Sequence, residues 1–445
     1  MTRVLAVDIG TSSARAQLFD DGAKPIGPPL ARLAYRADAN GELPLEPIVS
    51  FAESALATAG PVDAVAWSSL WHSLVLLDER GRAQTPVSTW LDPRAAPDAA
   101  ALAAELDGAD VHARTGAPLH ASFWPAKLRR LARVRARFSR VASLADYLRL
   151  RVDGELATSL SLASGTGLLD VHTLQWDRQL LDALELDEAV LPPICDDGVW
   201  LGDGAAANIG AGCTGACAAV TIGTSSALRV IRAEARSQPG LFLYRLDRRR
   251  YVQGGALSDG GNLLDWLSRL IGRPVGDALD RPPGDVTFLP HLGGERSPGW
   301  HAGARGVVSG LTHATNAADI AQAIFEGIGY RLAAILELVE SDRSDRSSQT
   351  KLENDVDQVQ ELVGTGAALV SRPGWAQLLA DVFGKPVTLS AVAEASARGA
   401  AVVALGLEDH PAPLGERFEP RPERTMQHRE ARARLDALYR ATASA

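Results

Sequence analysis

The chain has 445 residues, more than one hydrophobic core usually contains, so two domains are expected. Its 54 acidic and 45 basic residues give a formal charge of −9, which argues against a nucleic-acid-binding protein because such proteins normally have a basic face. Three cysteines, at positions 195, 213 and 217, indicate no disulfide framework and favour a cytoplasmic location. No stretch has the composition of a secretory signal or of a membrane span.

The first predicted element is a β-hairpin over residues 4–19, which read VLAVDIGTSSARAQLF. A β-branched run leads into a turn with one glycine and three hydroxyl groups, and an alternating segment follows. Backbone N–H and side-chain O–H groups in such a turn can bind an anion. Asp8 comes just before the turn, where its carboxylate could hold a hydrated Mg²⁺.

Strands and helices then alternate as far as residue 196. Residues 31–47 are expected to be irregular, and residues 62–77 are expected to form two strands around a polar turn. Helices are predicted over residues 48–59, 95–106, 127–138, 141–150 and 176–184. The helix over residues 127–138 is strongly basic, and we expect its charged face to lie in solvent.

The hairpin occurs a second time, after a Gly- and Ala-rich segment over residues 197–215 where we place the domain junction. Residues 218–231 read AAVTIGTSSALRVI, and the pentapeptide IGTSS is identical in both copies. Because the flanking segments match as well, we interpret the pair as an internal duplication. The G-x-G-x-x-G match over residues 210–215 follows no strand, so it does not indicate a dinucleotide-binding turn. Cys213 and Cys217 are expected to be small buried thiols.

The second half of the chain also mixes strands and helices. The predicted order is a strand, a glycine turn and a helix over 251–270, a Pro- and Gly-rich loop over 287–310, a long amphipathic helix over 316–339, a polar connector over 341–357, and helices over 375–383 and 394–405. The tail after residue 408 is expected to wrap the surface. These patterns predict two α/β domains, each opening with an anion-binding hairpin.

Two such hairpins suit a polyphosphate, and a nucleotide is the natural ligand. Phosphoryl transfer also needs a metal ion, an acceptor hydroxyl and a carboxylate that takes its proton. Asp203, with glycine on both sides, is the best candidate for that carboxylate, although the same pattern fits a helix N-cap. A sugar-like acceptor needs polar groups and an aromatic wall, which Trp71, His72 and the WLDPR segment over residues 90–94 provide. For the two tryptophans alone, core packing is the default interpretation.

In combination, these motifs resemble the FGGY carbohydrate kinases, which belong to the actin-like ATPases. The resemblance covers nearly all of residues 3–408. Its signatures are VLAVDIGTSS over 4–13, WHSLVLLDERG over 71–81, TPVSTWLDPRA over 85–95, GDGAAANIGAG over 202–212, VTIGTSSALRV over 220–230, GGNLLDWL over 260–267, LPHLGGERSPGW over 289–300, ARG over 304–306 and EASARGAA over 394–401. The resemblance implies an α/β fold of two duplicated ribonuclease-H-like (actin/hexokinase-like ATPase) domains around a central cleft. Residues 1–203 would bind the sugar and one side of the phosphates, and residues 204–445 would bind the nucleotide.

The resemblance also implies a role for each matching residue. Asp8 would position Mg²⁺, and Asp203 would be the general base that deprotonates the sugar hydroxyl. The residues expected at the phosphates are Gly10, Thr11 and Ser12 in the first hairpin and Gly223 and Thr224 in the second. Those expected near the rest of the nucleotide are Gly261, Asp265, Gly364 and Gly366, the last two in a loop that is longer than in relatives. Those expected to face the sugar are His72, Trp90, Asp92 and Arg94.

The implied activity is ATP-dependent phosphorylation of a sugar or sugar-acid hydroxyl, with ATP and Mg²⁺ as cofactors. Within the family, the motifs are most similar to gluconate kinases, and the carboxylate of gluconate would need a cation such as Arg94 or Lys127. A xylulose or other pentulose kinase is the closest alternative. A catalytically impaired sugar-binding sensor and an actin- or chaperone-like ATPase also stay open. The expected partner is a small-molecule sugar or sugar acid rather than nucleic acid or membrane, and a homodimer is compatible with these patterns.

Overall fold

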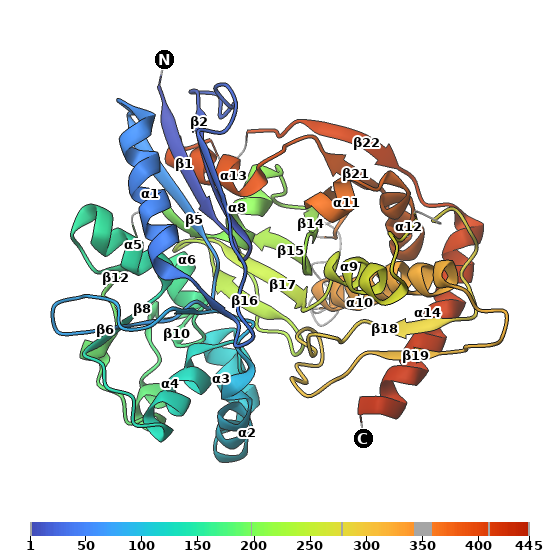
Figure 1. The fold of residues 1–445 in the computed structure, drawn as a ribbon, viewed down its shortest axis with the longest axis horizontal. Helices are drawn as coiled ribbons and strands as arrows, with labels where there is room; N and C mark the ends of the chain where they lie inside the picture. The colour runs from blue at the N-terminus through green and yellow to red at the C-terminus, as the bar shows by residue number, and fades with distance from the viewer. Residues whose placement is uncertain (1, 197, 277–278, 342–357, 408–409, 444–445) are drawn as a thin grey trace, which may run out of the picture. The chain divides into compact units, whose positions relative to one another are not determined.

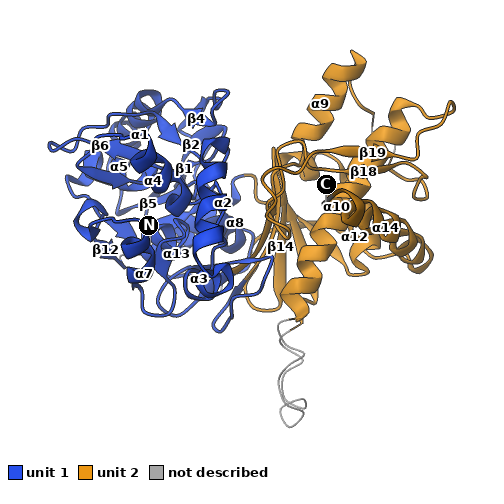
Figure 2. Cartoon of the chain, turned by 90° about the horizontal axis from the view of Figure 1, so that it is seen from below, with its two compact units in different colours: residues 1–212, 231–252, 394–411 blue, residues 213–230, 253–393, 412–445 orange. Residues whose placement is uncertain are grey.

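The computed structural model describes residues 2–196, 198–276, 279–341, 358–407 and 410–443 (Figure 1). The polar connector predicted over residues 341–357 lies outside these residues except for Ser341. The chain divides into two compact units, coloured separately in Figure 2. Unit 1 contains residues 1–212, 231–252 and 394–411, and unit 2 contains residues 213–230, 253–393 and 412–445.

The central sheet of unit 1 is built on the first predicted hairpin. Its five strands, in spatial order, are β13 (Trp200–Gly202), β5 (Ala64–Ser69), β1 (Val4–Ile9), β2 (Ser13–Phe19) and β3 (Ala31–Ala34). Strands β1 and β2 are antiparallel, while β5 runs parallel to β1 and β13 runs parallel to β5. Strand β1 is the middle strand and is buried along its whole length, which is why all its residues except Asp8 are apolar.

Small residues allow a helix to pack closely against this sheet. Three alanines of helix α13 (Ala395–Ala404) contact the sheet residues Val4, Ala6, Phe19 and Ala66. Helix α13 also packs on helix α8 (Asp203–Gly210), where a Cβ atom on Gly399 would come within 1.8 Å of the Ala206 carbonyl oxygen. A Cβ atom on Gly210 would come within 1.7 Å of the Ala395 carbonyl oxygen. The two helices therefore touch through their backbones, which requires glycine at both positions.

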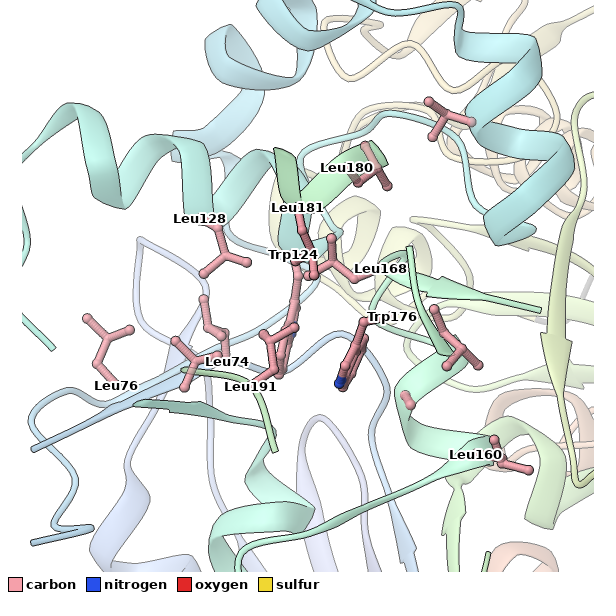
Figure 3. Packing of buried hydrophobic residues seen from close by; sticks show 14 residues of the cluster. Leu74, Leu76, Trp124, Leu128, Leu160, Leu168, Trp176, Leu180, Leu181 and Leu191 are labelled. Atoms are coloured by element: carbon pink, nitrogen blue, oxygen red, sulfur yellow. The ribbon is translucent and has the colours of Figure 1, made fainter. Parts of the chain in front are cut away.

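The remaining elements of unit 1 lie beside this sheet. They are β4 (Glu42–Leu43), α1 (Leu45–Ala59), β6 (Val75–Leu77), β7 (Val87–Ser88), η1 (Pro93–Ala95), α2 (Ala96–Glu105), α3 (Gly108–Thr115), α4 (Trp124–Arg133), β8 (Arg140–Ala142), α5 (Leu144–Asp153), β9 (Thr158–Ser159), α6 (Leu160–Ser164), β10 (Leu169–Asp170), β11 (Gln175–Trp176), α7 (Arg178–Ala183), η2 (Glu188–Val190) and β12 (Ile194–Cys195). Figure 3 shows Trp124 and Trp176 packed among leucines, with ring centroids 6.5 Å apart. This cluster is the second core of unit 1.

Two expectations for this region are wrong. Residues 31–47, expected to be irregular, contain β3, β4 and the start of α1. The basic helix begins at Trp124 and ends at Arg133, and Lys127 on it is only 3% exposed. Its charged face is therefore not wholly in solvent. The expectation failed because the side chain of a single lysine, one turn into the helix, has buried polar partners that the local pattern does not indicate.

The second hairpin is at the centre of a seven-stranded sheet. In spatial order the strands are β16 (Phe242–Arg245), β17 (Tyr251–Leu257), β15 (Ser226–Arg232), β14 (Cys217–Ile222), β20 (Glu361–Thr365), β21 (Val387–Ser390) and β22 (Leu414–Phe418). Strand β14 pairs antiparallel with β15 and parallel with β20, just as β1 pairs antiparallel with β2 and parallel with β5. The two hairpins thus have the same place in their sheets, in agreement with the predicted duplication.

Strand β16 belongs to unit 1. Within the described residues, five helices and a short β-ribbon accompany the other strands in unit 2. They are α9 (Asn262–Ile271), β18 (Thr287–Leu289), β19 (Val307–Ser309), α10 (Ala317–Ser341), α11 (Ala367–Val370), α12 (Pro373–Phe383) and α14 (Pro422–Ala443). The predicted loop over residues 287–310 therefore begins and ends in paired strands. The tail, expected to wrap the surface, contains β22 and the 22-residue helix α14. Helix α14 has many helix-forming Ala, Arg and Glu residues, but its apolar residues do not form the continuous stripe that predicts a helix.

The sulfur atoms of Cys213 and Cys217 are bonded to each other at 2.10 Å, so the expectation of two free thiols is wrong. The four-residue separation brings their Cα atoms to 5.0 Å, a normal distance for a disulfide. Within the described residues, no helix combines the length and the apolar composition that crossing a membrane requires.

Candidate active site

The turn of the first hairpin is held from two sides. The backbone N–H of Gly10 donates to the Ser13 carbonyl at 3.0 Å, and the Tyr35 hydroxyl donates to the Gly10 carbonyl at 2.7 Å. The indole N–H of Trp90 donates to the Thr11 hydroxyl at 3.1 Å. Trp90, predicted to face a sugar, therefore lies directly beside the turn predicted to bind phosphate, while Ser12 is exposed.

Asp8 lies near the carboxyl end of β1 and is 5% exposed. One carboxylate oxygen accepts a hydrogen bond from the Ser68 hydroxyl at 2.7 Å, and the other is 3.5 Å from the Arg15 guanidinium. Arg15 in turn contacts Glu394 at 3.2 Å. Burial raises the pKa of Asp8 to about 7, and the charges of Asp203 and Glu394 add to this shift against the opposing effects of Ser68 and Arg15.

The register of three parallel strands explains why the charge of Asp203 raises the pKa of Asp8. Ser68 of β5 is paired with Asp8 of β1 on one side and with Leu201 of β13 on the other. Asp203 follows β13 directly, so its carboxylate and that of Asp8 both lie at the carboxyl ends of parallel strands. Ligands of open α/β sheets bind at this edge. The arrangement brings together the predicted metal ligand and the predicted base.

Asp203 is the first residue of α8, and Gly202 occupies the N-cap position. The alternative interpretation, that Asp203 is the N-cap, is therefore wrong, although a negative charge in the first turn still suits the helix dipole. One carboxylate oxygen accepts a hydrogen bond from the Gly204 N–H at 2.8 Å, and the Ser396 hydroxyl lies 3.4 Å from the Asp203 carbonyl.

Asp8 and Asp203 suit a magnesium ion with few protein ligands better than a metal ion that is bound by protein ligands alone. Mg²⁺ in phosphoryl-transfer sites is usually bound by one or two carboxylates, and water and substrate phosphates supply its other ligands. In the part of the chain that the structure describes, no group of three or more His, Cys, Asp or Glu side chains is arranged as a metal site. Asp8 and Asp203 provide two carboxylates whose charges already repel each other, and a divalent cation would relieve that repulsion.

The segment after β5 contains one buried and one strained aromatic residue. Trp71 is 6% exposed and donates to the Ser161 carbonyl at 2.8 Å, so core packing, the default interpretation, is correct for it. A Cβ atom on Gly202 would lie 1.9 Å from the Trp71 indole nitrogen, which explains the glycine before Asp203. His72 has a φ angle of +65°, its ring nitrogen Nδ1 hydrogen-bonds the Gly165 carbonyl, and Phe123 contacts the ring edge-on at 4.9 Å.

Asp92 and Arg94 lie together, but they are bonded to each other. One Asp92 oxygen accepts from the Arg94 side chain at 2.8 Å, the other accepts from the Ser88 hydroxyl at 2.9 Å, and Arg94 also pairs with Glu42. Burial alone would raise the pKa of Asp92, but these hydrogen bonds hold it below its ordinary value. Both residues line a cavity of about 220 Å³ together with Lys127. The two cations considered for a sugar carboxylate are thus already engaged by protein groups.

In unit 2, the second hairpin turn meets the start of α9. The Gly261 N–H donates to the Gly223 carbonyl at 2.8 Å, and the Asn262 N–H donates to the Thr224 carbonyl at 3.3 Å. A Cβ atom on Gly261 would lie 2.8 Å from the Gly223 carbonyl oxygen, so only glycine allows this approach. Gly223 and Gly261, both predicted at the nucleotide, are therefore in direct contact, and Thr224 contacts the residue that follows Gly261. Asp265 is exposed in the first turn of α9.

The two glycines predicted to cover adenosine differ in position. Gly364 lies inside strand β20, where a Cβ atom would come within 2.9 Å of Leu369. Gly366 follows the strand with a φ angle of +90°, and a Cβ atom there would lie 2.4 Å from the carbonyl oxygen of Ile222. Gly366 thus allows the turn to approach the end of β14 closely, whereas Gly364 belongs to the sheet.

Several residues that hold these groups were missed from sequence. Ser68, Tyr35 and Glu394 anchor the first turn and Asp8, and they lie far from it along the chain. Asp259 is fully buried and accepts hydrogen bonds from Asn262 at 2.9 Å and from the Gly293 N–H at 3.1 Å. The sequence feature that could have identified Asp259 is the Asp-Gly-Gly-Asn run that begins at this residue.

Two family models match the chain. The model described as FGGY family of carbohydrate kinases, N-terminal domain, matches residues 46–222, and the model of the C-terminal domain matches residues 218–406. The fold is therefore that of a carbohydrate kinase.

Individual relatives agree with these matches. The chain is 27% identical to gluconokinase from Bacillus subtilis, over 90% of this chain and 87% of that protein. It is 31% identical to xylulose kinase from Streptomyces coelicolor, over 77% of this chain and 74% of that protein. The crystal structure of gluconate kinase from Lactobacillus acidophilus has the same fold, with a TM-score of 0.85 at 23% identity over 99% of this chain and 98% of that chain. The chain belongs to the FGGY family of carbohydrate kinases, which makes it an ATP-dependent phosphotransferase that acts on an alcohol group of a small sugar.

Proposed function

We propose that the chain transfers the terminal phosphate of ATP to a hydroxyl of a sugar acid of the gluconate type. The observation that supports this most directly is the pair Asp8 and Asp203 at the carboxyl ends of parallel strands, beside the turn over residues 10–12. Asp203 would accept the proton of the attacking hydroxyl. Mg²⁺ held by Asp8 would neutralise charge on the transferred phosphate.

The two halves of the chain would share the substrates. We propose that residues 1–203 bind the sugar through His72, Trp90, Asp92 and Arg94, and bind phosphate through Gly10, Thr11 and Ser12. Residues 204–445 would bind the nucleotide through Gly223, Thr224, Gly261, Asp265, Gly364 and Gly366. The hydrogen bonds from Gly261 to Gly223 and from Asn262 to Thr224 support that assignment. We further propose that the protein acts in the cytoplasm and has no nucleic-acid or membrane partner, and a homodimer would be compatible with this activity.

A pentulose kinase is the second candidate, and one observation favours it. Arg94 pairs with Asp92 and Glu42, and the Lys127 ammonium donates to the carbonyl groups of His72 and Thr89. A sugar acid would have to compete with these partners for a cation, whereas an uncharged ketose such as xylulose would not. A sensor that binds sugar without phosphorylating it remains the third alternative.

An ADP-release screen with Mg-ATP and gluconate, xylulose, ribulose or glycerol separates these candidates. We expect gluconate to give the highest kcat/KM, and higher kcat/KM with xylulose would favour the pentulose kinase. Asp203→Asn should lower kcat by about 10²–10⁴-fold without loss of nucleotide affinity, because the amide cannot accept the proton. Asp182→Asn, an exposed change on α7, is the matched control. Tight sugar binding by calorimetry without ADP formation would support the sensor, and normal turnover by Asp203→Asn would remove the residue from its role.

A further inference from the structure

Lys127 is a buried lysine whose ammonium group binds two main-chain carbonyls. It lies in the first half of helix α4 and is 3% exposed. Its Nζ atom donates to the His72 carbonyl at 2.7 Å and to the Thr89 carbonyl at 2.8 Å. The Thr89 carbonyl also accepts from the Asp92 N–H at 3.2 Å, so the ammonium group is a second donor there, and it joins two carbonyls that belong to different segments of the chain.

Both segments that Lys127 joins contain proposed sugar-facing residues. His72 follows strand β5 and has a φ angle of +65°, a conformation that costs a non-glycine residue about 1–3 kcal/mol unless its surroundings impose it. Thr89 follows strand β7 and comes directly before Trp90. Trp90 in turn donates to the Thr11 hydroxyl at 3.1 Å. One side chain thus connects His72, Trp90 and, through Trp90, the phosphate-binding turn.

The environment of Lys127 suits a positioning role better than a role in binding the substrate. Burial lowers the pKa of Lys127 to about 7, opposed by the charge of Asp92, so removing the ammonium group from water is costly. The two hydrogen bonds go to carbonyl oxygens and not to a carboxylate, which is the partner that normally stabilises a buried ammonium group. The fixed geometry of the segments that contain His72 and Thr89 offsets the cost of burying the ammonium group.

We propose that Lys127 is a positioning residue, which holds His72 and Trp90 in the geometry that accepts the sugar. This inference rests on the proposed function, because it assumes that the two residues face the sugar. It assigns to Lys127 no contact with the sugar, with ATP or with a carboxylate of the substrate.

The test compares Lys127→Met with Arg129→Met, which removes the same charge from the same helix and whose side chain pairs with Glu105. We expect Lys127→Met to raise the KM for the sugar about tenfold or more, and the Kd for Mg-ADP to stay within about twofold. Arg129→Met should change neither constant. Lys127→Arg, which keeps the charge and the donors, should have an intermediate KM and provides a variant in case Lys127→Met does not fold.

A crystal structure of Lys127→Met, or of Lys127→Arg, gives a second measurement that does not depend on activity. We expect His72 to leave the left-handed region and the segment containing Trp90 to shift. If the wild-type protein phosphorylates a sugar but Lys127→Met keeps the wild-type KM, the inference is overturned and the proposed function stands. If the wild-type protein phosphorylates no sugar, the proposed function fails, and the φ angle of His72 in the variant decides the inference. A value still near +65° would overturn it.

Discussion

Glu326 is a carboxyl group with little solvent around it. It lies in the buried part of helix α10, is 3% exposed, and accepts a hydrogen bond from Gln322 at 2.6 Å. Burial raises the pKa of Glu326 from its ordinary value of 4.5 to about 7, and the opposing effects of Gln322, Arg434 and Arg281 are smaller. The folded protein therefore binds a proton at this residue that the unfolded chain releases more easily.

This shift predicts a pH-dependent effect of Glu326→Gln. Because the folded-state pKa is the higher one, the stabilisation from this group is complete below about pH 4.5 and is lost as the pH rises through 7. Gln keeps a hydrogen-bond acceptor without a charge. We expect Glu326→Gln to raise the free energy of unfolding by roughly 2–3 kcal/mol near pH 8.5 and by almost nothing near pH 4.5. Urea titrations at both values measure this.

The exposed change Glu423→Gln on α14 is the control and should have little effect at either pH. An equal effect of Glu326→Gln at both pH values would show that ionisation of Glu326 is not its cause.

Some residues of the candidate site could be predicted from the sequence, and others could not. Asp8 and Asp203 were predicted because each has an informative neighbourhood, a Gly-Thr turn in one case and flanking glycines in the other. The hydroxyl of Ser68 and the guanidinium of Arg15, which oppose the effect of burial on the pKa of Asp8, come into contact with it only through strand pairing. Lys127 was predicted only as one of several basic residues on a helix and as a candidate cation for a sugar carboxylate, because its two carbonyl acceptors are 38 and 55 residues away along the chain.

At the scale of elements, the close approach of α8 and α13 makes the position of Asp203 depend on a glycine elsewhere. Asp203 is the first residue of α8, and Gly399 of α13 faces the Ala206 carbonyl of that helix. A Cβ atom at position 399 would lie 1.8 Å from that oxygen, which is far inside van der Waals contact. A larger residue must therefore separate the helices or displace the start of α8.

We expect Gly399→Ala to lower the free energy of unfolding by about 2–3 kcal/mol and to lower kcat, because Asp203 moves with its helix. Denaturant unfolding and steady-state kinetics measure the two effects. Gly108→Ala is the matched control: it lies at the start of α3 in the same unit, has nothing within 4 Å of the added Cβ atom, and should be neutral within about 0.5 kcal/mol. Unchanged stability and kcat in Gly399→Ala would show that the two helices separate at no cost.

Elements with a strong local pattern were predicted, and those defined by distant partners were not. The repeated pentapeptide identified both hairpins, and regular apolar spacing identified α10 and α13 within a few residues. Strand β3 was missed because it is a short edge strand, defined by pairing with β2 and not by alternation. Helix α14 was missed because its apolar contacts are few, although Ala431 and Leu435 pack on Leu289 and Tyr330.

At the scale of the whole molecule, unit 1 is assembled from three separate segments of the chain. Residues 231–252 supply Phe242 and Tyr244, whose rings lie 6.4 and 5.0 Å from the ring of Trp71. Residues 394–411 supply helix α13, which covers one face of the central sheet, and Glu394, which contacts Arg15. No local sequence feature predicts this arrangement, because residues 231–252 and residues 394–411 are each separated from residues 1–212 by part of unit 2.

The arrangement predicts that residues 1–212 do not form a stable domain alone. Without α13, the apolar residues Val4, Ala6 and Ala66 would lose their cover, and without residues 231–252 the ring of Trp71 would lose its contacts with Phe242 and Tyr244. Burying one large apolar side chain is worth about 1.5–3 kcal/mol. Several losses of this size together amount to a large part of the free energy of unfolding of an ordinary domain. We expect the fragment to show no cooperative thermal transition by calorimetry and poor dispersion in its amide NMR spectrum.

The control is a chain in which residues 1–212, 231–252 and 394–411 are joined by long Gly/Ser linkers, so that unit 1 is complete without the rest of unit 2. This chain should melt cooperatively, since every core contact described for unit 1 can form. A cooperative transition in the fragment 1–212 by itself would mean that the returning segments are additions to a domain that is already stable. Asp8 and Asp203 could then be studied in that fragment. We expect instead that their geometry depends on α13, because this helix packs on β1, which contains Asp8, and on α8, which begins at Asp203.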